Sequence, residues 1–120
     1  MRSYRKKRTR KFTYAAAGLL HGLCHDRSIR IQFFLGGMTV AAGLLFSLTW
    51  WEWCFVTAAI FLVIAAEYIN SAIEHIVDMI SLQYHPTAKI IKDYAAAAVL
   101  LVSLMAAVIG ILIFGGKLLW

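Results

Sequence analysis

Proline, cysteine and acidic residues are all scarce in this chain. Its 120 residues include one proline, two cysteines and six acidic side chains, against twelve lysines and arginines. The cysteines, Cys24 and Cys54, flank the first long apolar run and should face opposite sides of a bilayer, so a disulfide within one chain is not expected. That apolar run starts late and no small-residue cleavage site follows it, so a signal peptide is not expected either.

What the chain has in excess is apolar surface. Hydrophobic residues make up 62% of it and the mean hydropathy is +0.74. A chain of this length is too short to bury so much apolar area in a core of its own, and lipid is the simpler host. The composition and length therefore predict a single, all-α integral membrane domain.

Three apolar runs predict three membrane-spanning helices, at residues 31–49, 51–83 and 94–114. The first, Ile31–Thr49, is uncharged and just long enough to cross about 30 Å of hydrocarbon. Its small residues are typical of a contact with another helix or with another subunit: these are Gly36, Gly37, Ala41 and Gly43. The second run begins in a tryptophan-rich belt and is longer than a bilayer needs, so its second half should emerge into the cytoplasmic interface.

The first thirty residues hold nine of the twelve basic side chains. Residues 1–13 are predicted to form a frayed basic arm. From about Phe12 to Arg30 the spacing of apolar residues predicts an amphipathic helix that lies in the plane of the membrane interface. The alternative for this stretch is a helix that packs on a partner. A basic arm can bind nucleic acid, but beside apolar spans it anchors to anionic lipid, and no nucleic-acid partner is expected. The positive-inside rule predicts a cytoplasmic N-terminus and an external C-terminus in a bacterial plasma membrane.

Four polar residues share one face of the second span. Glu67, Asn70, Glu74 and Asp78 fall within about 80° of one another at 100° per residue. Glu67 lies about 24 Å along the helix from Trp51, close to the inner edge of the hydrocarbon. A row of polar side chains that runs from lipid to water can carry a proton, hold a metal ion or supply a general base to a lipid substrate. Glu74 and Asp78 taken alone can equally be the solvent-exposed end of a long helix.

Other polar groups are expected at the same inner boundary. Asp26 and the Lys92–Asp93 pair suit Mg²⁺ and the phosphates that complete its shell. No GxxxxGK[ST] loop occurs, so any nucleotide is not held by a P-loop. The remaining candidates are predicted to be solvent-exposed side chains rather than ligands of a metal or a phosphate: these are His21, Cys24, His25, His75 and His85.

Two segments carry a resemblance to a known family. EYINSAIEHIVD, residues 67–78, and YHPTAKIIKDYAAAAVLL, residues 84–101, resemble the prokaryotic diacylglycerol kinases, whose hallmark is Glu-x-x-Asn-[Ser/Thr]-Ala-Ile-Glu-x-x-x-Asp on the second span. An Ala-Lys-Asp-like element opens the third span, and here it is Lys92 and Asp93. The resemblance covers essentially the whole chain.

The resemblance implies a homotrimeric lipid kinase with active sites shared between subunits. It implies Glu67 as the general base on the lipid hydroxyl, with Asp26 and Glu74 as ligands of Mg²⁺–ATP. Other residues that it places at the nucleotide are Tyr14, Asp78, Tyr84, His85, Lys92 and Asp93, with Asn70, Ser71 and Arg30 in support.

Two departures from the family pattern affect these expectations. Position 26 is Asp where the family usually has Glu, so the metal is held through water or slightly displaced, and Gln83 stands where some members have an acid. The stretch IFLVIAAEYINSAIEHIVD and the preceding WEW resemble the undecaprenol kinases of Gram-positive bacteria more than the diacylglycerol kinases.

Two other classes of function fit part of the pattern. A small proton-coupled multidrug transporter also uses a membrane glutamate, but it has four spans and a lone acid. A structural subunit without chemistry predicts that Glu67→Gln is harmless or stabilising, because a buried charge without a partner is costly.

Overall fold

The computed structural model describes the backbone of residues 2–81 and 83–119, and side chains from Arg10 onward. The helices, in chain order, are α1 (Arg2–His25), α2 (Arg27–Leu45), α3 (Trp50–Ile80) and α4 (Pro86–Leu119). In this part of the chain, α2, α3 and α4 are each long and apolar enough to cross a membrane. The side chains of the basic arm up to residue 9 lie outside the described part, although its backbone is helical from Arg2 rather than frayed.

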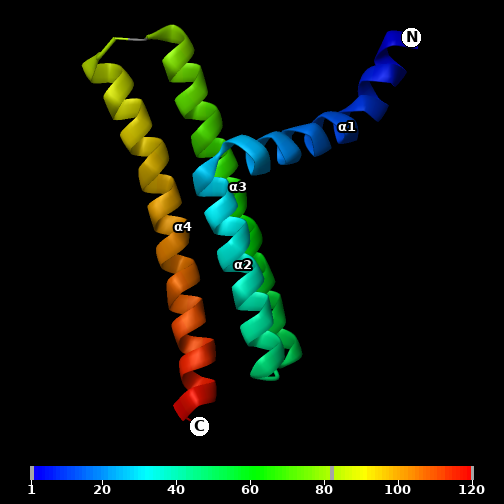
Figure 1. Cartoon of the computed structure of the whole chain (residues 1–120), viewed down its shortest axis with the longest axis vertical. Helices are drawn as coiled ribbons and strands as arrows, with labels where there is room; N and C mark the ends of the chain where they lie inside the picture. Colours follow the sequence, from blue (N-terminus) through cyan, green and yellow to red (C-terminus); the bar gives the residue numbers. More distant parts are fainter. Residues whose placement is uncertain (1, 82, 120) are drawn as a thin grey trace.

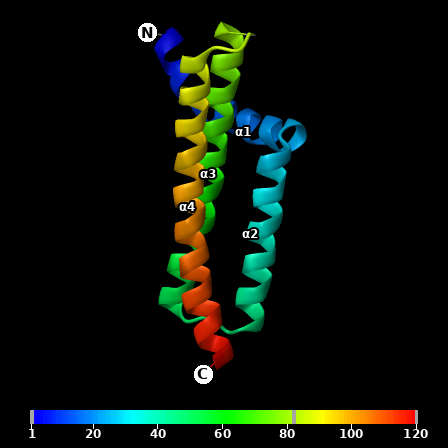
Figure 2. The same ribbon diagram turned by 90° about the vertical axis from the view of Figure 1, so that its left-hand side faces the viewer.

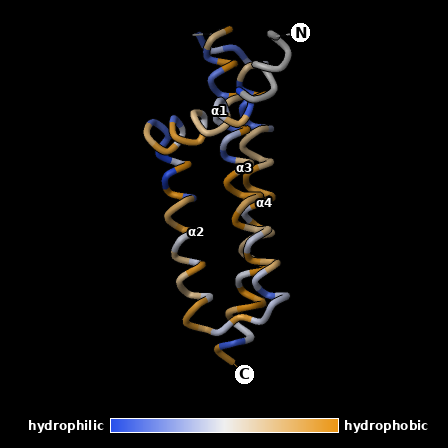
Figure 3. Tube along the Cα trace, turned by 90° about the vertical axis from the view of Figure 1, so that its right-hand side faces the viewer, coloured by the Kyte–Doolittle hydropathy of each residue, from blue (hydrophilic) through white to orange (hydrophobic). Residues whose placement is uncertain are grey.

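The three long helices stand side by side, and α1 leaves them at a steep angle (Figure 1). The N-terminus and the α3–α4 turn lie at one end of the molecule, and the C-terminus and the α2–α3 loop at the other. Hydrophilic residues gather at the first of these ends, while the middle of α2, α3 and α4 is mostly hydrophobic (Figure 3). This distribution fits a helix bundle whose apolar middle faces lipid.

Helix α3 is the central element of the bundle. It packs along α4 over most of its length and along α2 over a shorter stretch, whereas α2 and α4 stand apart (Figure 2). Within the described side chains, the buried apolar residues belong largely to α3: Val56, Ala59, Val63 and Val77. Most other large apolar side chains are exposed, as expected where lipid replaces a protein core.

Two glycines let α2 approach α3 closely. A Cβ on Gly43 would lie 2.7 Å from Trp53 Cη2, and one on Gly36 would lie 3.0 Å from Ile60 Cγ2. Gly37, by contrast, has open space where its Cβ would be. Gly36 and Gly43 therefore pack against α3 of the same chain, whereas Gly37 meets no described helix of this chain.

The helix ends differ from the sequence boundaries for local reasons. Asp26 interrupts the helix expected to run to Arg30, because its side chain accepts a bond from the Ile29 N–H and starts α2 at Arg27. Pro86, expected within the turn, is instead the first residue of α4, where its fixed φ and missing N–H are tolerated. Thr49 and Glu52 form a capping box that starts α3.

Candidate active site

The polar face of α3 changes from buried to exposed along the helix. Glu67 is 7% exposed and Ser71 is 9% exposed, and these are the buried polar side chains of the described chain. Asn70 is half-buried, whereas Glu74 and Asp78 are exposed. A carboxylate at the buried level is costly unless it interacts with something, which makes Glu67 the first candidate for chemistry.

Asp26 reaches this face from the junction between α1 and α2. Its Oδ1 accepts a 3.2 Å bond from the Ile29 N–H, and its Oδ2 accepts a short bond from the Ser71 hydroxyl. One side chain therefore caps α2 and joins it to α3, forty-five residues away in sequence. The same two bonds fix the orientation of the Asp26 carboxylate.

Hydrogen bonding keeps Asp26 ionised. Burial alone raises the pKa of its carboxyl, but bonds from the Ser71 hydroxyl and from the backbone N–H groups of Ile29 and Ser28 lower the pKa further than burial raises it. The resulting pKa lies below the ordinary value of 3.8, so the group is a carboxylate at neutral pH. Only the ionised form is a good ligand for a hard cation.

Glu67 has two acidic neighbours. Asp26 and Glu74 are the acidic groups that interact electrostatically with Glu67, and the Gln32 side chain of α2 is its polar neighbour. Sequence reasoning missed Gln32, because nothing in a single uncharged span indicates which of its faces meets α3.

Asn70, on the same face of α3, has a side-chain oxygen that accepts no hydrogen bond from any described residue. Its amide nitrogen donates a 3.3 Å bond to Glu74 Oε1, while its Oδ1 is buried without a partner. A buried carbonyl oxygen without a donor costs about 1–3 kcal/mol. A ligand that brings a hydroxyl, a metal-bound water or a cation to this oxygen would remove that cost.

The donor set fits a magnesium ion that is shared with phosphates. No three histidine, cysteine, aspartate or glutamate side chains converge into a complete metal cluster anywhere in the described chain. Asp26 and Glu74 together offer carboxylate oxygens, and Mg²⁺ characteristically takes one or two carboxylates and fills its remaining positions with water and phosphate oxygens. The residues present therefore fit Mg²⁺–ATP better than a resident structural metal.

A small pocket lies between α1 and α3 beside these groups. Its volume is about 170 Å³, and its polar lining comprises His21, His25, Asp26, Tyr68, Ser71 and His75. His21 and His25 stack with ring centroids 4.3 Å apart, and His75 Nδ1 is 2.7 Å from the Ser71 carbonyl oxygen. The three histidines thus line the wall of this pocket.

The remaining expected residues lie outside the Glu67 group in the single chain. Lys92 pairs with Asp78 at 2.6 Å and Lys89 pairs with Asp93 at 2.6 Å, near the α3–α4 turn. Asp78 is about 16 Å along α3 from Glu67.

Tyr84 and His85 occupy the turn itself. Tyr84 is 80% exposed, and His85 Nδ1 accepts a 3.1 Å bond from the Thr87 N–H.

Tyr14 and Arg30 are exposed on α1 and α2. Tyr14 is 62% exposed and about 18 Å along α1 from Asp26. The Arg30 guanidinium donates a 3.3 Å bond to the Cys24 carbonyl oxygen. Their roles at a nucleotide stay predictions.

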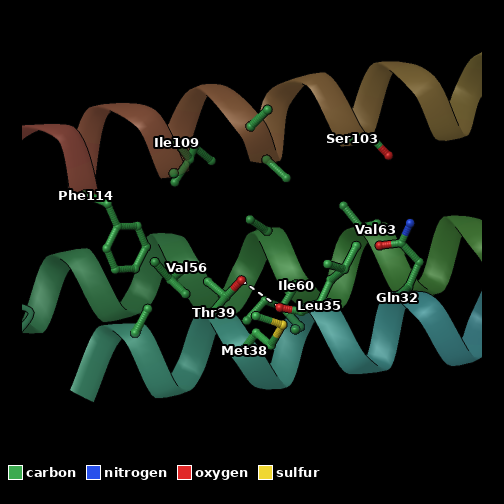
Figure 4. A pocket seen from close by; sticks show the side chains of 16 residues that line it. Gln32, Leu35, Met38, Thr39, Val56, Ile60, Val63, Ser103, Ile109 and Phe114 are labelled. Carbon is green, nitrogen blue, oxygen red and sulfur yellow. Dashed lines mark hydrogen bonds between the residues drawn. The ribbon is translucent and has the colours of Figure 1, made fainter. Parts of the chain in front are cut away.

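A larger cleft opens between α2, α3 and α4, along the apolar part of these helices (Figure 4). Its volume is about 570 Å³ and its lining is largely apolar. Gln32 and Ser103 lie toward one end of the cleft and Phe114 toward the other. Because Gln32 is also the polar neighbour of Glu67, the cleft leads from the apolar middle of the bundle to the carboxylates.

Comparison with known proteins identifies the family to which this chain belongs. A sequence model of the prokaryotic diacylglycerol kinases matches residues 13–114. An undecaprenol kinase from Bacillus subtilis is 33% identical over 91% of this chain and 89% of its own length. Diacylglycerol kinases from Synechocystis and Pseudomonas aeruginosa are 36% and 32% identical, over 82% and 71% of this chain and 57% and 69% of their own lengths. On these matches, the chain belongs to the prokaryotic diacylglycerol kinase family.

Proposed function

We propose that this protein transfers the γ-phosphate of ATP to the hydroxyl of a membrane lipid, with undecaprenol favoured over diacylglycerol. The observation that carries the proposal is that the buried Glu67 has two acidic neighbours, Asp26 and Glu74, where the apolar bundle gives way to its polar end. A lipid hydroxyl and a water-borne nucleotide can reach each other only at such a boundary. Undecaprenol is supported by the extent of the match to the Bacillus subtilis enzyme of that name.

Each carboxylate has a separate part in the proposed reaction. Glu67, at the buried level, accepts the proton of the lipid hydroxyl as the hydroxyl oxygen attacks the γ-phosphorus, and the bond from that phosphorus to the β–γ bridging oxygen breaks to release ADP. Asp26 and Glu74 would hold Mg²⁺, which when bound neutralises charge on the phosphates. Asn70 orients Glu74 through its amide nitrogen and leaves its Oδ1 to accept from an incoming donor.

The apolar cleft is the proposed seat of the lipid chain. It borders Gln32, so a chain lying along it would bring its headgroup end toward Glu67. Holding the hydroxyl near both the base and the phosphate converts a two-body encounter into a positioned reaction.

The surroundings of the site complete the proposal. In the proposed topology, α1 lies at the cytoplasmic interface of the membrane, with the N-terminus in the cytoplasm and the C-terminus on the external side. In the proposed assembly, three chains form a homotrimer in which neighbouring subunits complete the nucleotide site. Tyr14, Tyr84 and His85 are exposed in the single chain and therefore accessible to a neighbour or a nucleotide.

The test of substrate is phosphate transfer from labelled ATP in mixed micelles that contain either undecaprenol or diacylglycerol. We expect Mg²⁺-dependent labelling of both lipids, with the higher kcat/KM for undecaprenol. A higher kcat/KM for diacylglycerol would reverse the substrate preference and leave the kinase assignment standing. Absence of labelling of either lipid in the presence of Mg²⁺ would contradict the proposed function.

A further inference from the structure

Helix α1 is joined to α3 by a tyrosine that fits against a glycine. The Tyr68 hydroxyl donates a 2.7 Å bond to the Leu19 carbonyl oxygen. Gly22 is buried under the same ring, and a Cβ at that position would lie 2.8 Å from Tyr68 Cζ and Oη. Any side chain at position 22 would therefore displace the tyrosine, because the ring and not a flexible chain end occupies the space.

This contact and the Asp26–Ser71 bond form one seam between the two helices. Asp26 follows Gly22 by one turn, and its N–H still bonds the Gly22 carbonyl oxygen at 2.9 Å. On α3, Ser71 follows Tyr68 by three residues and shares its face. Displacing Tyr68 thus moves α1 at the point from which Asp26 is carried.

Among the described side chains, the Tyr68 contact is the main link between α1 and α3. Helix α1 projects away from the bundle along the rest of its length (Figure 1), and within the part of the chain that the structure describes its hydrogen bond to α3 is the one that Tyr68 donates to Leu19. The direction in which α1 leaves the bundle is consequently set at the Tyr68 ring.

We propose that Tyr68, seated on Gly22, is a positioning residue that holds the Asp26 carboxylate opposite Ser71 and the Glu67–Glu74 face. This inference rests on the proposed function, in which Asp26 contributes to binding Mg²⁺–ATP. Tyr68 itself touches neither substrate, and its effect passes through the helix to Asp26.

The kinetic test compares Gly22→Ala with the double variant Gly22→Ala/Tyr68→Leu. The added methyl should raise the KM for Mg²⁺–ATP about tenfold, the effect expected when one hydrogen bond to a charged group is lost, with the KM for lipid within about twofold of wild type. Shortening residue 68 to leucine removes the clash, so the double variant should recover part of the lost affinity. Gly37→Ala is the matched control, because open space surrounds that glycine.

A structural readout separates this inference from the proposed function. Spin labels on the two natural cysteines, Cys24 on α1 and Cys54 on α3, are both accessible and report the angle between the helices. Diluting the labelled chain with a Cys24→Ser/Cys54→Ser chain isolates the distance within one subunit. Gly22→Ala should broaden or shift this distance, and the double variant should restore it.

The two possible failures are distinguishable. If wild type labels no lipid while the spin-label distance still responds to Gly22→Ala and recovers in the double variant, the kinase assignment fails and the seam stands as a structural feature. If wild type is an active kinase but Gly22→Ala leaves both the KM for Mg²⁺–ATP and the distance unchanged, the positioning inference is wrong.

Discussion

Asp26 shows how one side chain can serve the fold and the site together. Its two oxygens are used separately, one to cap α2 and one to meet Ser71. The sequence placed Asp26 at the same boundary as the polar face of α3, but its bond to Ser71 was not predictable, because a contact across forty-five residues has no local signature. The helical spacing of Glu67, Asn70 and Glu74, by contrast, was sufficient to predict their common face.

Removing the Ser71 hydroxyl should weaken nucleotide binding more than folding. A hydrogen bond to a charged group contributes about 1.5–3 kcal/mol, so Ser71→Ala should lower kcat/KM for Mg²⁺–ATP by roughly ten- to a hundredfold. The measurement is initial rate against Mg²⁺–ATP concentration at saturating lipid. Ser81→Ala removes a hydroxyl that bonds only the Gln83 carbonyl oxygen and is the control; equal effects of the two changes would contradict the account.

The pH dependence of stability should carry the signature of Asp26. Its folded-state pKa is below 3.8, so its stabilising contribution is complete above the unfolded value and is lost as the pH falls through the folded pKa. The free energy of unfolding in detergent should therefore fall more steeply below about pH 4 in wild type than in Asp26→Asn. Parallel curves for the two proteins would show that Asp26 gains no stabilising partners on folding.

At the scale of elements, the packing of α2 on α3 depends on particular glycines. The sequence predicted that Gly36, Gly37 and Gly43 form a packing face, and the structure separates them. A period of 3.6 residues turns neighbouring glycines to different directions, so Gly36 faces Ile60 while Gly37 does not. Which of two adjacent small residues meets the partner helix depends on rotation about the helix axis, and composition does not reveal it.

Gly43→Ala should destabilise the protein and Gly37→Ala should not. The new methyl at position 43 would press on Trp53 and Leu48, and overpacking of this kind costs about 1–3 kcal/mol. Alanine at position 37 meets open space and improves helix propensity by up to about 1 kcal/mol. Detergent-unfolding midpoints measure both changes, and similar midpoints for the two variants would argue against the α2–α3 packing described here.

At the scale of the whole molecule, the bundle is asymmetric. Helix α3 packs on both neighbours, and the cleft between α2 and α4 remains open beside it. The number and order of the long helices followed from the apolar runs alone. The cleft could not be predicted from the sequence, because it depends on the angles at which the helices pack in the tertiary structure.

Narrowing this cleft should impair lipid use selectively. Ala106 lines it, and Ala106→Leu would introduce three additional carbon atoms into the apolar lining. We expect the KM for lipid to rise by about ten- to a hundredfold, the cost of 1–3 kcal/mol associated with overpacking, while the KM for Mg²⁺–ATP stays unchanged. Ala97→Leu, on an exposed part of the same helix, is the control. A matching rise in both KM values would mean that Ala106→Leu perturbs the bundle instead of the lipid seat.

The proposed role of Glu67 as the base of a lipid kinase is tested by turnover of Glu67→Gln. At saturating Mg²⁺–ATP and lipid, the account predicts a kcat about a hundred- to ten-thousandfold below wild type, with Mg²⁺–ATP still bound. Glu52→Gln, at the far end of the same helix, is the matched control and should turn over as wild type does. A Glu67→Gln protein with wild-type kcat would contradict the account.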